Sequence, residues 1–108
     1  MRNRDMKNEE TLDFLTAALC RDYERRREAI ENGSFSRRTL VEFRYLNFKI
    51  LEAAIEIAGE DDAEIYIREI GYSIGYANSE ITDKSEVYYK KCKKCIKENI
   101  AKKLHLQD

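Results

Sequence analysis

Two cysteines three residues apart, Cys92 and Cys95, come closest in this chain to a chemical motif. A CxxC pair can act as a redox dithiol or as half of a zinc site, and Cys20 and His105 would complete a four-ligand set in number. This pair falls in the middle of a helical pattern, whereas a redox pair follows a strand, and the spacings match no familiar zinc module. We interpret the three cysteines as packed thiols and expect no metal site and no cofactor.

An acidic cluster formed by Glu60, Asp61, Asp62 and Glu64 could also bind a metal ion or supply paired carboxylates for acid–base catalysis. The cluster lacks the spacing of a calcium-binding loop, and acidic residues in the first turn of a helix complement the positive end of the helix dipole. The only histidine, His105, lies in a tail that offers no ordered partner for nucleophilic catalysis. We therefore expect no catalytic residues and no enzymatic activity.

Length and composition indicate one soluble domain. The 108 residues are enough for one modest core, with 43% hydrophobic and 38% charged residues. No apolar run is long enough to cross a membrane, and residues 1–10 lack the apolar stretch of a secretory signal. Three cysteines make a poor disulfide framework. These features predict a single cytoplasmic domain over residues 1–108, with flexible ends at about 1–7 and 105–108 and no membrane contact.

The elements that must position these residues are helices. The chain has no proline and only four glycines, which favours long helices over a β architecture with many turns. Apolar spacing predicts four helices, at about residues 8–31, 37–58, 61–81 and 86–104. The third keeps its apolar stripe through Gly71 and Gly75, so we expect it to be continuous and expect the glycines to allow a close helix crossing. The predicted fold class is an all-α, compact bundle of about four helices.

The helix predicted at 37–58 is the central one, because about two-thirds of its circumference is apolar. Besides its main apolar side it carries a second line of Val41, Phe48 and Ile55. We therefore expect neighbouring helices to cover it on two or three sides.

Two polar residues, Arg44 and Asn47, interrupt the apolar arc of this central helix. Buried polar groups of this kind often fix the register or the association of helices at some cost in stability. We interpret both as specificity or interface residues. On this interpretation, the substitution Asn47→Leu is expected to raise the melting temperature.

The helix predicted at 61–81 carries a second apolar strip, formed by Ile65, Tyr72 and Tyr76, on the side opposite its core stripe. The strip either completes the core of the monomer or meets a partner, and tyrosine is enriched at protein interfaces. Four helices are few to cover a broadly apolar central helix. We therefore expect self-association, with a homodimer as its form.

Charge is unevenly distributed, although the net charge is only −1. An acidic stretch at 52–86 precedes a basic stretch at 87–108, and the simplest interpretation is that the fold neutralises itself. Five acidic residues are expected to form a surface that engages a basic protein: Glu52, Glu56, Asp61, Asp62 and Glu69. We therefore hypothesise a non-enzymatic protein–protein interaction or regulatory module, such as an inhibitor that acts through this acidic surface on a basic or nucleic-acid-handling partner.

Direct nucleic-acid binding is the alternative hypothesis, because basic residues also cluster along the chain. The clusters are Arg25–Arg27, Arg37–Arg38 and the lysine side of the last predicted helix, namely Lys90, Lys91, Lys93, Lys94, Lys97 and Lys102. A near-zero net charge and an isoelectric point of about 5.9 argue against this alternative.

Overall fold

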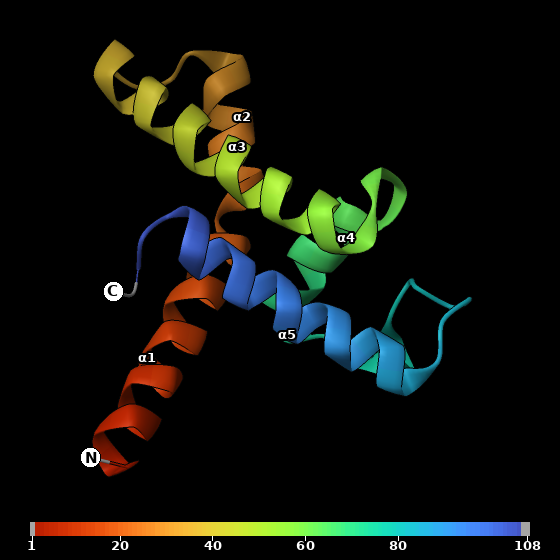
Figure 1. Cartoon of the computed structure of the whole chain (residues 1–108). Helices are drawn as coiled ribbons and strands as arrows, with labels where there is room; N and C mark the ends of the chain where they lie inside the picture. Colours follow the sequence, from red (N-terminus) through yellow and green to blue (C-terminus); the bar gives the residue numbers. More distant parts are fainter. Residues whose placement is uncertain (1, 107–108) are drawn as a thin grey trace.

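A computed structural model of the chain describes the backbone of residues 2–106 and the side chains of residues 9–106. Over this range the elements are α1 (Arg2–Arg21), α2 (Tyr23–Asn32), α3 (Arg37–Ala58), α4 (Glu60–Gly71), the 3₁₀ turn η1 (Tyr76–Asn78) and α5 (Glu86–Lys103) (Figure 1). The described residues contain no β-strand, so the prediction of a small all-α bundle is confirmed. The expected flexible ends lie mostly outside the described side chains and stay a prediction.

The helix predicted at 8–31 forms two successive segments, which meet at Asp22. The break is slight, because the Asp22 amide still donates to the Ala18 carbonyl (3.2 Å) and the Arg26 amide to the Asp22 carbonyl (3.0 Å). Figure 1 accordingly shows α2 continuing the column begun by α1. The column ends at Gly33, whose backbone is left-handed (φ 62°, ψ 33°), as the sequence predicts for a glycine that stops a helix.

The central helix, α3, has the predicted bounds. The Ser36 hydroxyl accepts a hydrogen bond from the Thr39 amide (3.3 Å) and caps its N-terminus. At the other end, Gly59 adopts a positive φ of 86°, which favours glycine, and α4 starts at the next residue. α3 packs against α2, α4 and α5, which places it at the centre of the fold.

The prediction of a continuous third helix over 61–81 is wrong, because α4 ends at Gly71. The chain reverses at Ser73 (φ 55°), where the Ile74 amide donates to the Glu69 carbonyl (2.9 Å). The segment 72–85 then runs as a loop through η1 and returns a buried side chain, Ile81, to the core. Beside these backbone contacts the loop is held by side chains, since the Glu80 amide donates to Glu69 and the Ile81 amide to Ser79, and the period of the apolar stripe does not reveal such bonds.

The expected close helix crossing forms at one of the two glycines. A Cβ atom on Gly71 would lie only 2.6 Å from the backbone N and Cα atoms of Arg21, so the backbones of α1 and α4 are in direct contact there. The prediction is confirmed for Gly71. The prediction is wrong for Gly75, which lies in the loop, where an added Cβ atom would meet nothing within 4 Å.

The molecule is flat, with principal extents of 41 × 39 × 21 Å. A helix with its side chains is about 10 Å across, so the shortest dimension holds about two layers of helices. The core lies between these layers and includes Ile50, Ala53 and Ala54 of α3 beside Ile96 of α5. In this flat arrangement, part of α3 stays exposed to solvent. No helix among residues 2–106 has the length and apolar character required to cross a membrane.

Candidate functional site

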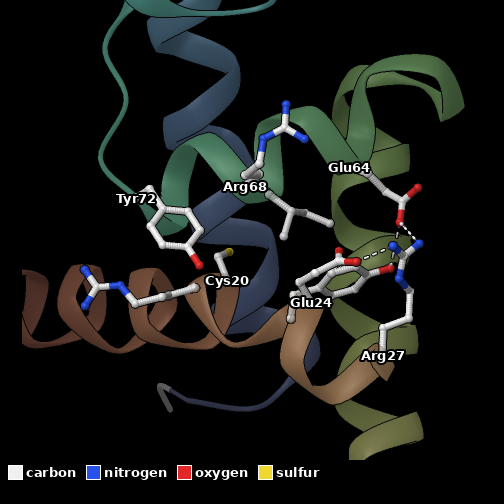
Figure 2. A pocket seen from close by; sticks show the side chains of 9 residues that line it. Cys20, Glu24, Arg27, Glu64, Arg68 and Tyr72 are labelled. Carbon is white, nitrogen blue, oxygen red and sulfur yellow. Dashed lines mark hydrogen bonds and ion pairs between the residues drawn. The ribbon is translucent and has the colours of Figure 1, made fainter. Parts of the chain in front are cut away.

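A pocket of about 400 Å³ opens where the junction of α1 and α2 faces α4 (Figure 2). It is lined by Cys20, Arg21, Tyr23, Glu24, Arg27, Glu64, Ile67, Arg68 and Tyr72. Figure 2 shows the Arg27 guanidinium between Glu24 and Glu64, and the Tyr72 hydroxyl pointing toward α1. The pocket therefore combines arginines, carboxylates and tyrosines from α1, α2, α4 and the residue that follows α4.

The polar groups of this pocket bind one another. Arg27 forms an ion pair with Glu24 and lies 3.6 Å from Glu64, while the Tyr23 hydroxyl donates to the same Glu64 carboxylate (3.4 Å). Burial raises the pKa of the Cys20 thiol to about 12, so the thiol stays protonated at neutral pH and is a poor nucleophile. These contacts fit a cluster that ties α2 to α4.

The charges of Glu52 and Glu56 on α3 are bound within the chain. The Lys103 amino group of α5 lies 3.1 Å from Glu52 and 2.8 Å from Glu56, and the Asn99 side-chain amide donates to Glu56 (3.0 Å). These bonds lower the pKa of Glu56. The fold neutralises this part of the expected acidic surface, whereas Asp61 and Asp62 lie in the first turn of α4, beside the positive end of the helix dipole.

Glu69 does not belong to an acidic surface, and that expectation is wrong. Its side chain is only 1% exposed. Its carboxylate accepts hydrogen bonds from the Ser79 hydroxyl (2.6 Å), the Glu80 amide (2.8 Å) and the Tyr89 hydroxyl (2.7 Å). A buried carboxylate requires several hydrogen-bond donors, and two of the three here come from the loop 72–85. Glu69 thus links this loop to α4 and α5.

Ile65, Tyr72 and Tyr76 do not form one strip, because α4 ends before both tyrosines. Ile65 packs against the core, while Tyr72 is exposed. Tyr76 packs against Tyr89, with 5.6 Å between ring centroids, and its hydroxyl donates to the Lys84 carbonyl (2.7 Å). Tyr76 therefore helps to complete the monomer, and the expected shared face is wrong.

Of the two polar residues expected at an interface, only Asn47 is buried, and Arg44 is exposed. The Arg26 Nε atom donates to the Asn47 side-chain oxygen (2.6 Å), and the Asn47 side-chain amide donates to the Tyr23 carbonyl (3.1 Å). Asn47 thus sets how α3 meets α2 within one chain.

The three arginines of the basic cluster Arg25–Arg27 have different surroundings. Arg26 is buried, and this burial lowers the pKa of its guanidinium, which also donates to the Leu19 carbonyl (2.5 Å). Arg27 belongs to the pocket cluster, so Arg25 alone extends into solvent without an ion-pair partner among the described side chains. The arginines do not form a continuous basic surface.

Half of the lysine side of α5 is engaged within the fold, while Lys91, Lys94 and Lys102 are exposed. Lys93 donates to the Ile74 carbonyl (2.7 Å) and lies over the Tyr89 ring. Lys97 binds Asp13 of α1 (2.5 Å), and Lys90 binds Glu86 (2.7 Å). Such contacts leave less unpaired positive charge to bind the phosphates of a nucleic acid.

The three cysteines are free thiols; Cys20 and Cys92 are buried, and Cys95 is half-buried. His105 is exposed at the end of α5. In the described part of the chain, no three His, Cys, Asp or Glu residues are arranged to hold a metal ion.

The largest departure from the sequence prediction is an uncovered apolar face on α3, formed by Val41, Tyr45 and Phe48. These side chains are 55%, 50% and 61% exposed, and their spacing puts them on one side of the helix. The Lys49 amino group lies 5.8 Å from the Tyr45 ring and 5.9 Å from the Phe48 ring. The expectation that neighbours would cover Val41 and Phe48 is wrong, because α2, α4 and α5 occupy the other sides of α3.

We call Val41, Tyr45 and Phe48 the α3 face. The sequence signal for it is the second apolar line through Val41 and Phe48, but the periodicity of one helix contains no information on the flatness of the fold. Comparisons of the chain with protein-family models, with curated proteins and with solved structures gave no match.

Proposed function

We propose that this chain is a protein–protein interaction or regulatory module and that the α3 face is its binding surface. One observation carries the proposal: three large apolar side chains on one side of a long helix are each at least half exposed to solvent. Scattered apolar side chains are normal on protein surfaces, but a contiguous set is characteristic of interaction sites. The expected homodimer belongs to this proposal as its simplest assembly.

The spacing of the α3 face supports recognition by a groove or by another helix. Val41, Tyr45 and Phe48 are four and three residues apart. This is the i, i+4, i+7 pattern by which helices present anchoring side chains to a partner. Two of the three are aromatic, and aromatic side chains supply much of the binding free energy at protein interfaces.

The proposed surface is apolar rather than acidic. Glu52 and Glu56 bind Lys103, and Glu69 is buried, so the five expected acidic residues do not offer a common free surface. Direct nucleic-acid binding receives less support than protein binding, because Arg26 is buried and Lys93 and Lys97 are engaged inside the fold.

The proposal is tested by comparative capture. The tagged full chain is used as bait in extract of its source cells, with and without nuclease treatment, beside the variants Tyr45→Glu and Phe48→Glu. The matched control is Val87→Glu on α5, which changes an apolar side chain that is 78% exposed and lies outside the α3 face. We expect wild type and Val87→Glu to retain the same proteins and both α3 variants to lose them.

Two outcomes would contradict the proposal. If all four baits retain the same proteins, the α3 face is not the binding surface. If capture depends on intact nucleic acid and vanishes after nuclease treatment, nucleic-acid binding replaces protein binding. Circular dichroism of each variant shows whether the helical fold is preserved.

A further inference from the structure

We infer that the occupant of the α3 face is a second copy of this chain, packed with its α3 antiparallel to the first. The inference rests on the proposed function, because it assigns a partner to the same surface. Its basis is the placement of two charged residues of α3, Arg38 and Glu52, on either side of the apolar side chains.

Two charged residues on α3 are spaced symmetrically about Tyr45. Arg38 lies seven residues before Tyr45, and Glu52 lies seven residues after it. Successive helical residues are about 100° apart, so Arg38, Glu52 and the α3 face fall within about 80° of the helix circumference. A spacing of seven residues returns to nearly the same side of a helix, so Arg38, Tyr45 and Glu52 occupy equivalent positions along a packed helix pair.

A two-fold axis at Tyr45 pairs these residues in an antiparallel dimer. Tyr45 meets Tyr45 of the second copy, and Arg38 meets Glu52 of the second copy on both sides of the axis. Val41 is four residues before the axis and Phe48 three after it, so they meet with an offset of one residue, about 1.5 Å along the helix. Among Arg38, Val41, Tyr45, Phe48 and Glu52, this pairing brings apolar side chains against apolar ones and the basic side chain against the acidic one.

The parallel arrangement would instead juxtapose identical residues. Arg38 would face Arg38 and Glu52 would face Glu52, and like charges across an interface are unfavourable. Arg38 is exposed and has no carboxylate within ion-pair distance among the described side chains, so it can bind a partner. The Glu52 side chain is 35% exposed, and Lys103 (3.1 Å) and Lys49 (3.9 Å) both contact its Oε1 atom. The Oε2 atom of Glu52 is therefore the oxygen that Arg38 of the second copy would bind.

The experiment is a charge exchange followed by sedimentation equilibrium over a range of protein concentrations. Wild type, Arg38→Glu, Glu52→Arg and the double variant Arg38→Glu/Glu52→Arg are compared, with Arg25→Glu on α2 as the matched control. We expect wild type and Arg25→Glu to dimerise. We expect each single exchange to raise the dimer dissociation constant about tenfold or more, because it creates two symmetric like-charge contacts. The double variant should recover dimerisation, which also shows that the single variants did not merely misfold.

Failure of the inference is separable from failure of the proposed function. A wild-type chain that stays monomeric at every concentration overturns the second copy as occupant, while the capture experiment still decides whether the α3 face binds another protein. A dimer that survives both single exchanges and Phe48→Glu uses another surface and overturns the inference. A dimer that Phe48→Glu dissociates but the charge exchanges do not weaken overturns the antiparallel register.

Discussion

The side chains of Arg26 and Asn47 form a buried hydrogen bond between α2 and α3, with 2.6 Å between the donating Nε and the accepting oxygen. The Asn47 amide also donates to the Tyr23 carbonyl, so three residues of the two helices are joined. This link holds the α2–α3 pair in one register. It also means that the interface fixed by Asn47 lies inside one chain.

The substitution Asn47→Leu is therefore expected to destabilise the protein, opposite to the sequence-based expectation. It removes the acceptor of a buried guanidinium and the donor to the Tyr23 carbonyl, which should cost about 2 kcal/mol in the free energy of unfolding. The double variant Arg26→Met/Asn47→Leu replaces both partners with apolar groups and should recover most of that loss. Urea unfolding of wild type and both variants measures these changes, and a higher free energy of unfolding for Asn47→Leu than for wild type would refute this assignment.

Gly71 and Gly75 give a matched pair of alanine substitutions. Gly71→Ala would place a Cβ 2.6 Å from the Arg21 backbone, which cannot move without shifting α1. We expect a loss of about 1–3 kcal/mol in stability. Gly75→Ala meets no atom, and its backbone lies at φ −86°, so it should be neutral or stabilise by about 0.5 kcal/mol. Equal melting temperatures for the two variants would show that α1 and α4 do not cross in backbone contact.

Glu69 is expected to be essential for the order of the loop 72–85. In Glu69→Gln, an NH₂ group replaces one of the oxygens that accept from Ser79, Glu80 and Tyr89. The resulting mismatch should cost about 1–3 kcal/mol and should speed hydrogen exchange at the Glu80 amide. Glu28→Gln on the exposed side of α2 is the control. Unchanged exchange at Glu80 would mean that the carboxylate does not hold the loop.

The protein should lose stability in alkaline solution. Burial raises the pKa of Tyr23 to about 12, with Glu64 adding to the effect, and burial also raises the pKa of Tyr89 to about 12. The unfolded chain ionises its tyrosines at about pH 10, so the native state is favoured below that pH and loses this advantage as pH rises toward 12. Urea unfolding across this window should show falling stability, with a shallower fall in Tyr23→Phe. A flat profile would contradict the burial of these hydroxyls.

Much of the fold could be predicted from local sequence signals. Ser36 caps α3, Gly33 stops α2, and Ser85 accepts a hydrogen bond from the Tyr88 amide at the start of α5. Such signals act within a few residues, so a single sequence contains them. The close crossing at Gly71 was also predictable, because a glycine on a core stripe indicates close approach of another backbone.

The parts that failed depend on partners far apart in the sequence. The apolar stripe continued past Gly71, yet the chain turns there because Ser79, Glu80 and Tyr89 supply donors to Glu69. Likewise, no local sequence signal around Arg26 predicts its hydrogen bond to Asn47, which lies 21 residues away. The α3 face was missed for a global reason, since periodicity shows that a helix side is apolar but not whether another layer exists to cover it.

The central claim is that a protein partner covers the α3 face in the working assembly, and side-chain footprinting by hydroxyl radicals tests it most directly. Tyr45 and Phe48 are labelled in the intact cellular assembly and in the purified chain at low concentration, with exposed Phe14, Tyr72 and Val87 as internal references. We expect Tyr45 and Phe48 to be protected in the assembly while the three references react equally in both samples. Equal labelling of Tyr45 and Phe48 in the two samples would contradict the claim.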